Sequence, residues 1–222
     1  SPYRSPTDMG VNMAGFAIVD DAACQAASRM EILRRYYTGL VDRVRGKCDE
    51  CVVRKLEIVM QQAGVTPDIC PAVRASLDKA QATGAPAGAM VLPDGRVVTG
   101  KTSSLLGPSA AMLLNAVKLL AGIDKDLDLL PASIIAPISD MKLRHLGHHN
   151  PRLHSDEVLI ALSISAVTNP LAERVLKKLD DLRGSEAHFS VILSEEDAKL
   201  YKRLGIHVSC EPRYEVKKLY HK

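Results

Sequence analysis

The spacing of hydrophobic positions changes along the chain and predicts three regions. Residues 1–19 hold prolines and glycines among polar residues and end in a short apolar stretch, which indicates a loop followed by a short strand. Residues 20–84 have helical spacing, whereas residues 85–222 combine strand-like and helix-like segments. The pattern predicts an α/β protein in which a helical subdomain precedes a larger α/β subdomain.

The helical subdomain is predicted to contain three helices. Asp20 or Asp21 can cap the first, and the second covers about 50–63. Thr66 followed by Pro67 is predicted to open the third, because Thr can cap a helix and Pro fits its first turn. The three ends are marked by residues that favour the position just past a helix: Gly46, Gly64 and Gly84.

The α/β subdomain begins with a predicted hairpin. The run PAGAMVLPDGRVVTG has Asp94-Gly95 between two apolar stretches, which is a strong hairpin signal. Further helices are predicted over about 109–121, 133–146, from Ser155 onward, from Asn169-Pro170 to Leu182, and after Ser194, with strands at HFSVIL and IHVSC.

Composition narrows the class of protein. Hydrophobic residues make up 46% and charged residues 25% of the 222 residues, values that are typical of a globular protein. No apolar run reaches the roughly 18–20 residues of a membrane span, and a net charge of +3 argues against nucleic acid as a partner. Five cysteines without a secretory leader indicate reduced thiols and a cytoplasmic location. The first residue is Ser, which indicates processing or a longer parent polypeptide.

One motif resembles a phosphate-binding loop. Gly95 to Thr102 fits the pattern of two glycines followed by Lys and Thr. That chemistry needs a flexible loop leading directly into a helix. Here Val97 and Val98 favour an extended strand, and Gly107-Pro108 interrupt the chain before the helix. We therefore favour the hairpin over the nucleoside-triphosphate site.

The segment from Gly88 to Ile123 resembles the start of the cytidine-deaminase-type fold. A hairpin, a short loop and a buried Ala-rich helix follow one another as in that family. The resemblance implies a three-layer α/β/α subdomain. The family's helix begins with a zinc ligand and a catalytic Glu, but this chain has Ser109-Ala110-Ala111 there. We therefore expect no metal site and no cofactor.

Cys48 and Cys51 form one Cys-x-x-Cys pair. Such a pair can supply half of a zinc site or act in redox chemistry. No second pair is present to complete four ligands, so we favour ordinary helix packing and leave the metal or redox alternative open.

Polar loops supply the candidate ligand-binding residues. Three sets of hydrogen-bond donors lie in loops, where binding residues concentrate, and the richest is LRHLGHHNPRLHSDE. The alternative for its histidines is helix capping. The candidates are Ser5, Asp8, Asn12, Lys101, Thr102, Ser103, Ser104, His149, Asn150, Arg152 and His154.

Several runs together resemble one family along the whole chain. SPTDMGVNMAG, GRVVTGKTSSLLG, LGHHNPRLHSDEVLIALSISAVTNP and LGIHVSCEP occur in the order found in the bacterial family of the domain of unknown function 1846. The resemblance is to its carboxy-terminal half and implies that the amino-terminal half of the same protein is a partner. It implies no catalytic residues, so whether the protein is an enzyme stays open.

Two functions are consistent with these features. The leading hypothesis is binding of a small anionic ligand, such as a nucleotide or a phosphorylated metabolite, by the three polar loops at the ends of the strands. The alternative is a structural module that forms a homo-oligomer through its apolar helices and has no site of its own.

Overall fold

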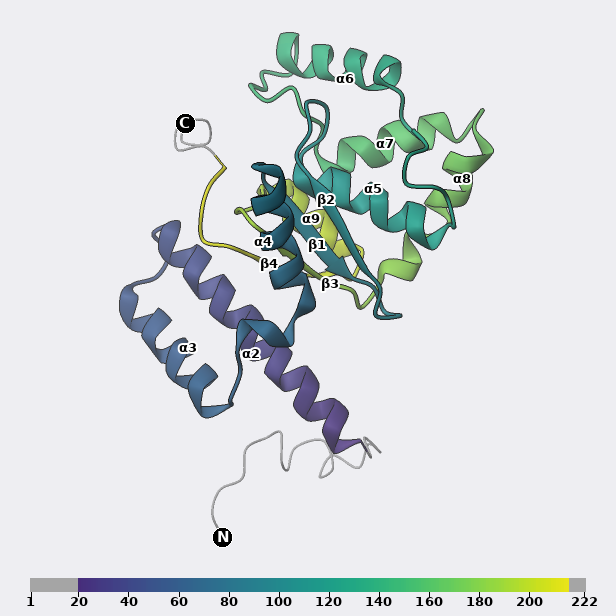
Figure 1. Ribbon diagram of the computed structural model, residues 1–222. Helices are drawn as coiled ribbons and strands as arrows, with labels where there is room; N and C mark the ends of the chain where they lie inside the picture. The colour runs from purple at the N-terminus through teal and green to yellow at the C-terminus, as the bar shows by residue number, and fades with distance from the viewer. Residues whose placement is uncertain (1–19, 216–222) are drawn as a thin grey trace. The chain divides into compact units, whose positions relative to one another are not determined.

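The computed structural model describes residues 20–215, which divide into two compact units between Ile69 and Cys70 (Figure 1). The first unit is helical and the second is mixed α/β, so the predicted class is confirmed. The predicted loop and strand over residues 1–19 lie outside the described residues. No helix of the described part is long and apolar enough to cross a membrane.

The first unit is built around two helices. α2 spans Asp21–Val44, and the Asp20 carboxylate caps it by accepting the Ala23 N–H at 2.9 Å. α3 spans Glu50–Gln62, capped in the same way by Asp49. Both helices lie where the sequence predicted them, because acidic N-caps and positive-φ glycines mark their ends unambiguously.

The predicted start of the third helix is wrong. Pro67 opens only a single 3-10 turn, η1 (Pro67–Ile69), and α4 spans Pro71–Thr83. A proline disfavours helical geometry in the residue before it, and Cys70, which precedes Pro71, is extended with φ −111° and ψ 102°. The helix therefore cannot begin before Pro71. Gly84 ends it in the left-handed conformation, as predicted.

The boundary between the two units also differs from the predicted one. The sequence placed it after residue 84, whereas the division lies before α4. α4 packs on β1 and its sheet neighbours, and its inward residues Ala72, Val73 and Ser76 are buried. The third helix thus belongs with the sheet.

The strands of residues 20–215 form one four-stranded sheet in the order β2-β1-β3-β4. Its strands are β1 (Ala87–Val91), β2 (Val97–Lys101), β3 (Glu186–Phe189) and β4 (His207–Cys210). β1 is antiparallel to β2 and β3, and β3 is parallel to β4. The predicted hairpin is confirmed, with Gly95 in its turn at φ 84°. Residues 97–101 are therefore strand, and no phosphate-binding loop leads into a helix here.

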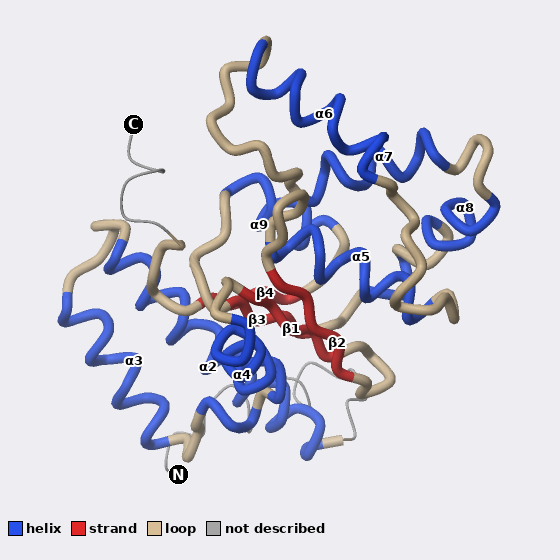
Figure 2. The backbone as a smooth tube through the Cα atoms, turned by 45° about the horizontal axis from the view of Figure 1, so that its top comes forward, coloured by secondary structure: helices blue, strands red, loops and turns tan. Residues whose placement is uncertain are grey.

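Helices cover both faces of the sheet (Figure 2). α4 lies on one face and α5 (Pro108–Leu120) on the other. Gly88 and Gly100 pair in register and allow α5 to approach closely, since a Cβ on Gly100 would lie 2.3 Å from the Met112 nitrogen. The remaining helices are α6 (Ala132–Arg144), α7 (Ser155–Ser165), α8 (Pro170–Leu176), η2 (Asp180–Leu182) and α9 (Glu195–Arg203).

The start of β1 and the ends of the other three strands lie at the same end of the sheet. We call it the carboxyl edge and define it by Pro86, Thr102, Ser190 and Glu211. The Thr102 N–H donates to the Pro86 carbonyl at 2.8 Å. The Ala87 N–H donates to the Ser190 hydroxyl at 2.9 Å. These two bonds connect the start of β1 to the ends of β2 and β3.

Candidate functional site

Two of the three predicted polar loops lie side by side. Leu106 and Leu153 form an isolated parallel bridge. The Leu153 N–H donates to the Leu105 carbonyl at 2.9 Å, and the Gly107 N–H donates to the Leu153 carbonyl at 3.2 Å. The segments 102–107 and 150–154, which lead into α5 and α7, are therefore held together. The third set, Ser5, Asp8 and Asn12, falls outside the described residues.

The residues of the first loop have different environments. Lys101 ends β2 and is exposed, as is Ser104. The Ser103 hydroxyl accepts the N–H groups of Leu105 and Leu106 at 3.2 and 3.0 Å, so it shapes the turn. Thr102 is buried, and its hydroxyl has no hydrogen-bond partner among the described residues.

The second loop is organised by side chains that contact backbone. His149 is exposed. The Asn150 side-chain oxygen accepts the Arg152 N–H at 3.1 Å and fixes the turn before α7. Arg152 extends from this turn and pairs with Glu215 at 2.7 Å.

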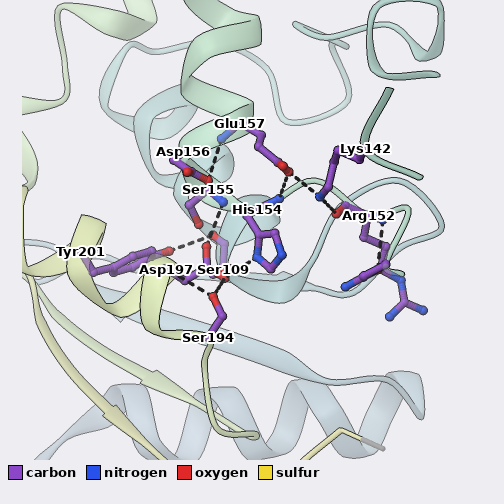
Figure 3. Close-up of polar contacts among 11 residues, drawn as sticks. Ser109, Lys142, Arg152, His154, Ser155, Asp156, Glu157, Ser194, Asp197 and Tyr201 are labelled. Carbon is purple, nitrogen blue, oxygen red and sulfur yellow. Dashed lines mark hydrogen bonds and ion pairs between the residues drawn. The ribbon is translucent and has the colours of Figure 1, made fainter. Parts of the chain in front are cut away.

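His154 joins the starts of α7 and α9 through a buried carboxylate (Figure 3). Its Nδ1 lies 3.2 Å from Oδ2 of Asp197, whose side chain is only 6% exposed. The Ser194 hydroxyl donates to the same oxygen at 3.0 Å, and the Ser155 N–H donates to Oδ1 at 2.9 Å. Asp197 therefore receives bonds from three directions.

These contacts shift the pKa values of both partners. The hydrogen bond that the His154 ring donates to the Asp197 carboxylate raises the pKa of His154, although burial opposes the change. Burial alone would raise the pKa of Asp197, but the bonds from His154 and from Ser155 outweigh it and lower the pKa to about 2. Near neutral pH Asp197 is a carboxylate, and His154 carries positive charge to a higher pH than an ordinary histidine.

A second buried ion pair supports the same loop. Lys142 of α6 is almost completely buried and contacts Glu157 at 2.6 Å and the Arg152 carbonyl at 2.8 Å. The same Glu157 oxygen accepts the His154 N–H at 2.8 Å, at the N-terminus of α7. Lys142 and Glu157 thereby hold the loop that carries Arg152 and His154.

The start of α5 differs from the starts of α7 and α9. α7 has Asp156 and Glu157 in its first turn, and α9 has three acidic residues there. α5 has no acidic residue in its first turn and no side-chain cap. The Tyr201 hydroxyl donates to the Ser109 carbonyl at 2.8 Å, which ties α9 to this turn. The buried Ser109 hydroxyl has no partner among the described residues.

A pocket of about 570 Å³ opens at the carboxyl edge. We call it the edge pocket. α4 supplies one wall, and the segment that follows β4 supplies another. Its lining residues are Leu77, Ala80, Gln81, Gly84, Ala85, Pro86, Ser190, Val191, Arg213, Tyr214 and Glu215. Within it the Arg213 Nε–H donates to the Ser190 carbonyl at 2.6 Å, and Arg213 is an exposed residue.

The sequence did not single out Asp197, Lys142 or Arg213 as site residues. Ser194 and Asp197 carried the pattern of a helix cap, and that cap is confirmed by the bond from the Asp197 N–H to the Ser194 hydroxyl at 3.1 Å. The pairing of Asp197 with His154 spans 43 residues and depends on the packing of α7 against α9. The acidic cap was therefore visible in the sequence, but its partner was not.

The residues at the start of α5 do not fit a zinc ion. Ser109, Ala110 and Ala111 offer no imidazole, thiolate or carboxylate ligand. No group of three or more His, Cys, Asp or Glu residues within the described part could hold a metal ion. Cys48 donates to the Gly39 carbonyl at 3.4 Å, while Cys51 is exposed.

The chain matches two family models in succession. Residues 68–220 match the domain of unknown function DUF1846, C-terminal, and residues 1–64 match DUF1846, N-terminal. The chain belongs to the DUF1846 family. The chain carries matches to both DUF1846 models, so its correspondence to the carboxy-terminal half of the longer proteins is not confirmed and stays a prediction. The junction of the two matches lies close to the division between the two units.

Curated bacterial relatives extend the comparison. A UPF0371 protein of Corynebacterium glutamicum strain R is 54% identical over all 222 residues. A UPF0371 protein of Streptococcus thermophilus strain LMG 18311 is 51% identical over the same length. The chain covers 45% of each of these relatives. Any activity of the longer proteins can therefore be assigned to this chain only as a proposal.

Proposed function

We propose that the chain binds a small phosphorylated ligand at the start of α5, between the loops 102–107 and 150–154. The observation that carries the proposal is the pair of buried hydroxyls, Thr102 and Ser109, that have no partner among the described residues. They accompany a helix N-terminus without an acidic residue of its own. Helix N-termini attract anions because their first N–H groups are unpaired and the helix dipole is positive there.

The strand geometry directs Thr102 toward that helix. A Cβ on Gly100 would meet Ala111 and Met112 of α5. Thr102 directly follows β2 and continues its pairing, because its N–H donates to the Pro86 carbonyl, so we expect it to face the same side of the sheet as Gly100. Two residues of strand advance about 6.7 Å, which corresponds to about four residues of helix. The Thr102 side chain is thus aimed at the first turn of α5, which contains Ser109.

The energetics favour a ligand that accepts hydrogen bonds. A buried hydroxyl without a partner costs about 1–3 kcal/mol. Phosphate oxygens would accept from both hydroxyls and from the free N–H groups of the helix. Arg152 and His154 lie in the adjoining loop, where each is paired with a carboxylate, Glu215 and Asp197 respectively, and the raised pKa of His154 favours its charged form. The loop residues 103–106 would have to shift to admit the ligand, since both hydroxyls are covered.

Calorimetric titration with inorganic phosphate tests the proposal. We expect the wild-type chain to bind phosphate, and Thr102→Val or Ser109→Ala to weaken binding about tenfold, which corresponds to about 1.4 kcal/mol. Ser185→Ala is the matched control, because Ser185 is also buried without a described partner but precedes β3 at the opposite end of the sheet. Absence of phosphate binding, or equal binding by all four proteins, would refute the proposed site.

The same location agrees with the deaminase-like architecture, which we retain as a proposal. The hairpin β1–β2 followed by α5 against its face is the arrangement that the resemblance implies. The metal-binding triplet of that family corresponds to Ser109-Ala110-Ala111. A ligand at this turn would occupy the equivalent place without a metal ligand from these three residues. An experimental structure superposed on deaminases would test the architecture.

A second candidate function is self-association through α7. Ile160 and Ile164 of α7 are 59% and 63% exposed and lie one helical turn apart, and Val167, just past the end of the helix, is 83% exposed. Met141 of α6 and Leu146, just past the end of α6, are 53% and 61% exposed. Large exposed apolar groups of this kind are typical of protein interfaces, and we propose a second copy of the chain as the occupant.

Sedimentation velocity at micromolar concentration tests this second function. We expect a dimer that Ile164→Glu converts to a monomer. Lys199→Glu, on an exposed position of α9, should leave the dimer intact. A wild-type monomer would refute self-association.

A further inference from the structure

We infer that the ligand is a nucleoside phosphate whose base and sugar occupy the edge pocket while its phosphate lies at the start of α5. The inference rests on the proposed phosphate site, but a separate observation carries it. The edge pocket has a volume of about 570 Å³, which lies within the usual range for small-molecule sites of roughly 300–1,000 Å³.

The lining of the pocket suits a nucleobase. Leu77 and Ala80 of α4 and Val191 provide apolar surface, while Arg213 and Tyr214 contribute planar groups. Bases stack on guanidinium and aromatic planes in single-stranded nucleic-acid recognition, and the same contacts are available to a free base. The Arg213 guanidinium is held by its Nε–H bond to Ser190, which fixes the orientation of its plane.

Gln81 supplies the polar group that a purine edge needs. A carboxamide can both donate to and accept from the edge of adenine, and this bidentate pairing is the usual way in which Gln reads that base. Gln81 lies in the last turns of α4 and lines the pocket. No hydrogen bond of its side chain is found among the described residues.

Glu215 places a carboxylate between the base and the phosphate. It lines the edge pocket and pairs with Arg152 at 2.7 Å. Carboxylates at such positions accept hydrogen bonds from ribose hydroxyls in nucleotide-binding folds. Arg152 neutralises Glu215 and comes from the same loop as His154. The Arg152–Glu215 ion pair therefore links the proposed sugar position to the loop beside the proposed phosphate position.

The two parts of the site are also joined through the backbone. Pro86 lines the edge pocket, and its carbonyl accepts the Thr102 N–H at 2.8 Å. The pocket lies on the α4 side of the sheet and Thr102 faces α5. A ligand in both parts would therefore cross the carboxyl edge over the start of β1 and the end of β2, and ligands bind at the carboxyl ends of strands in open α/β sheets.

Parallel titrations with AMP, adenosine and inorganic phosphate test the inference on the whole chain. We expect AMP to bind at least tenfold more tightly than phosphate, because base and sugar contacts are added. Ala80→Trp should fill the pocket, reduce AMP affinity to the level of phosphate, and leave phosphate affinity unchanged. Ala82→Trp is the matched control, since Ala82 is exposed on the same helix and does not line the pocket.

The outcomes separate this inference from the proposed function. Phosphate binding with AMP no tighter than phosphate, or AMP binding unaffected by Ala80→Trp, would overturn the nucleoside inference and leave the phosphate site standing. Absence of phosphate binding would overturn both. If Ala80→Trp does not fold, Gln81→Leu serves instead. It should weaken AMP about tenfold without affecting phosphate, and an unchanged AMP affinity would again overturn the inference.

Discussion

The two units of this chain differ in whether they bury charge: both carry exposed ion pairs, but among the described residues the buried ones lie in the second unit. In the first unit, Glu31 pairs with Arg34 and Arg35, and Arg43 pairs with Glu50, with most of these side chains well exposed. In the second unit, the side chains of Lys142 and Asp197 are 1% and 6% exposed. The first arrangement is common on helix surfaces, whereas the second requires charge to be moved out of water.

The difference indicates that the buried ion pairs of the second unit serve a purpose other than stability. An exposed ion pair contributes about 0–1 kcal/mol. A buried one gains little over an apolar pair, because the desolvation penalty offsets the attraction, yet it is costly to break. Lys142 and Asp197 fix α6, α7 and α9 around the loop of Arg152 and His154. We interpret them as positioning groups for the proposed ligand site.

Asp197→Ala should have the largest effect on stability. It leaves the Ser155 N–H, the Ser194 hydroxyl and a half-buried His154 without their acceptor. We expect a loss of about 4 kcal/mol in the free energy of unfolding, measured by urea denaturation of the second unit. Asp181→Ala removes one partner of an exposed pair and should cost less than about 0.5 kcal/mol. Equal losses would contradict the contrast between buried and exposed charges.

Lys142→Met should have a somewhat smaller effect. Met fills similar space, but Glu157 and the Arg152 carbonyl lose their donor. Because Glu157 is 19% exposed, water can partly replace the lysine. We therefore expect a loss of about 3 kcal/mol. Lys177→Met, which breaks an exposed pair with Glu173, is the control and should change stability by less than about 0.5 kcal/mol. A Lys142→Met protein as stable as wild type would show that the buried pair is dispensable.

The pair of His154 and Asp197 should also make stability depend on pH. The pKa of Asp197 is about 2 in the folded chain, against about 3.8 when unfolded. This contribution of about 2 kcal/mol is complete above pH 3.8 and is lost as the pH falls toward 2. The pKa of His154 is raised, so its contribution is complete below about pH 6.5 and is lost as the pH rises through the folded value.

Nuclear magnetic resonance titration of the His154 ring checks the second half of this prediction. The charged groups that act on the ring are Asp197 of α9, Lys142 of α6 and Glu157 of α7. In Asp197→Asn the pKa of His154 should fall below its wild-type value, because the main group that stabilises the imidazolium is gone. An unchanged His154 pKa in that variant would exclude Asp197 as the cause.

Local patterns were sufficient to predict most of the helices and the hairpin. Asp20, Ser194 and Asp94-Gly95 act within a few residues of the chain, and each has the predicted role. The predicted start of the third helix was wrong for a local reason that the sequence also contains, since Pro71 disfavours helical geometry at Cys70. That this helix packs on the sheet could not be predicted from the sequence, because the apolar residues of α4 do not specify which part of the protein they pack against.

The candidate site was predicted only where a loop sequence carried the chemistry by itself. The loops of Lys101 to Ser104 and His149 to His154 were selected for their donors, and the bridge between Leu106 and Leu153 joins them. The role of each residue in these loops depends on partners that lie far away in the sequence. Ser103 turned out to shape a turn, whereas His154 found its carboxylate on α9. The edge pocket forms between α4 and residues 213–215, and no local motif marks it.

The smallest effect is expected in the first unit, where Arg43 pairs with Glu50 across the turn between α2 and α3. Both side chains are 40–54% exposed, so water and salt compete with their attraction. A double-mutant cycle with Arg43→Gln and Glu50→Gln should give a coupling energy below about 1 kcal/mol, read from hydrogen exchange of α2 and α3 amides, which reports the stability of that unit. The coupling should also shrink in 1 M salt. A coupling energy as large as the loss caused by Lys142→Met, and unchanged in 1 M salt, would show that burial does not distinguish the ion pairs of the two units. Our interpretation of Lys142 and Asp197 as positioning groups for the ligand site would then lose its support.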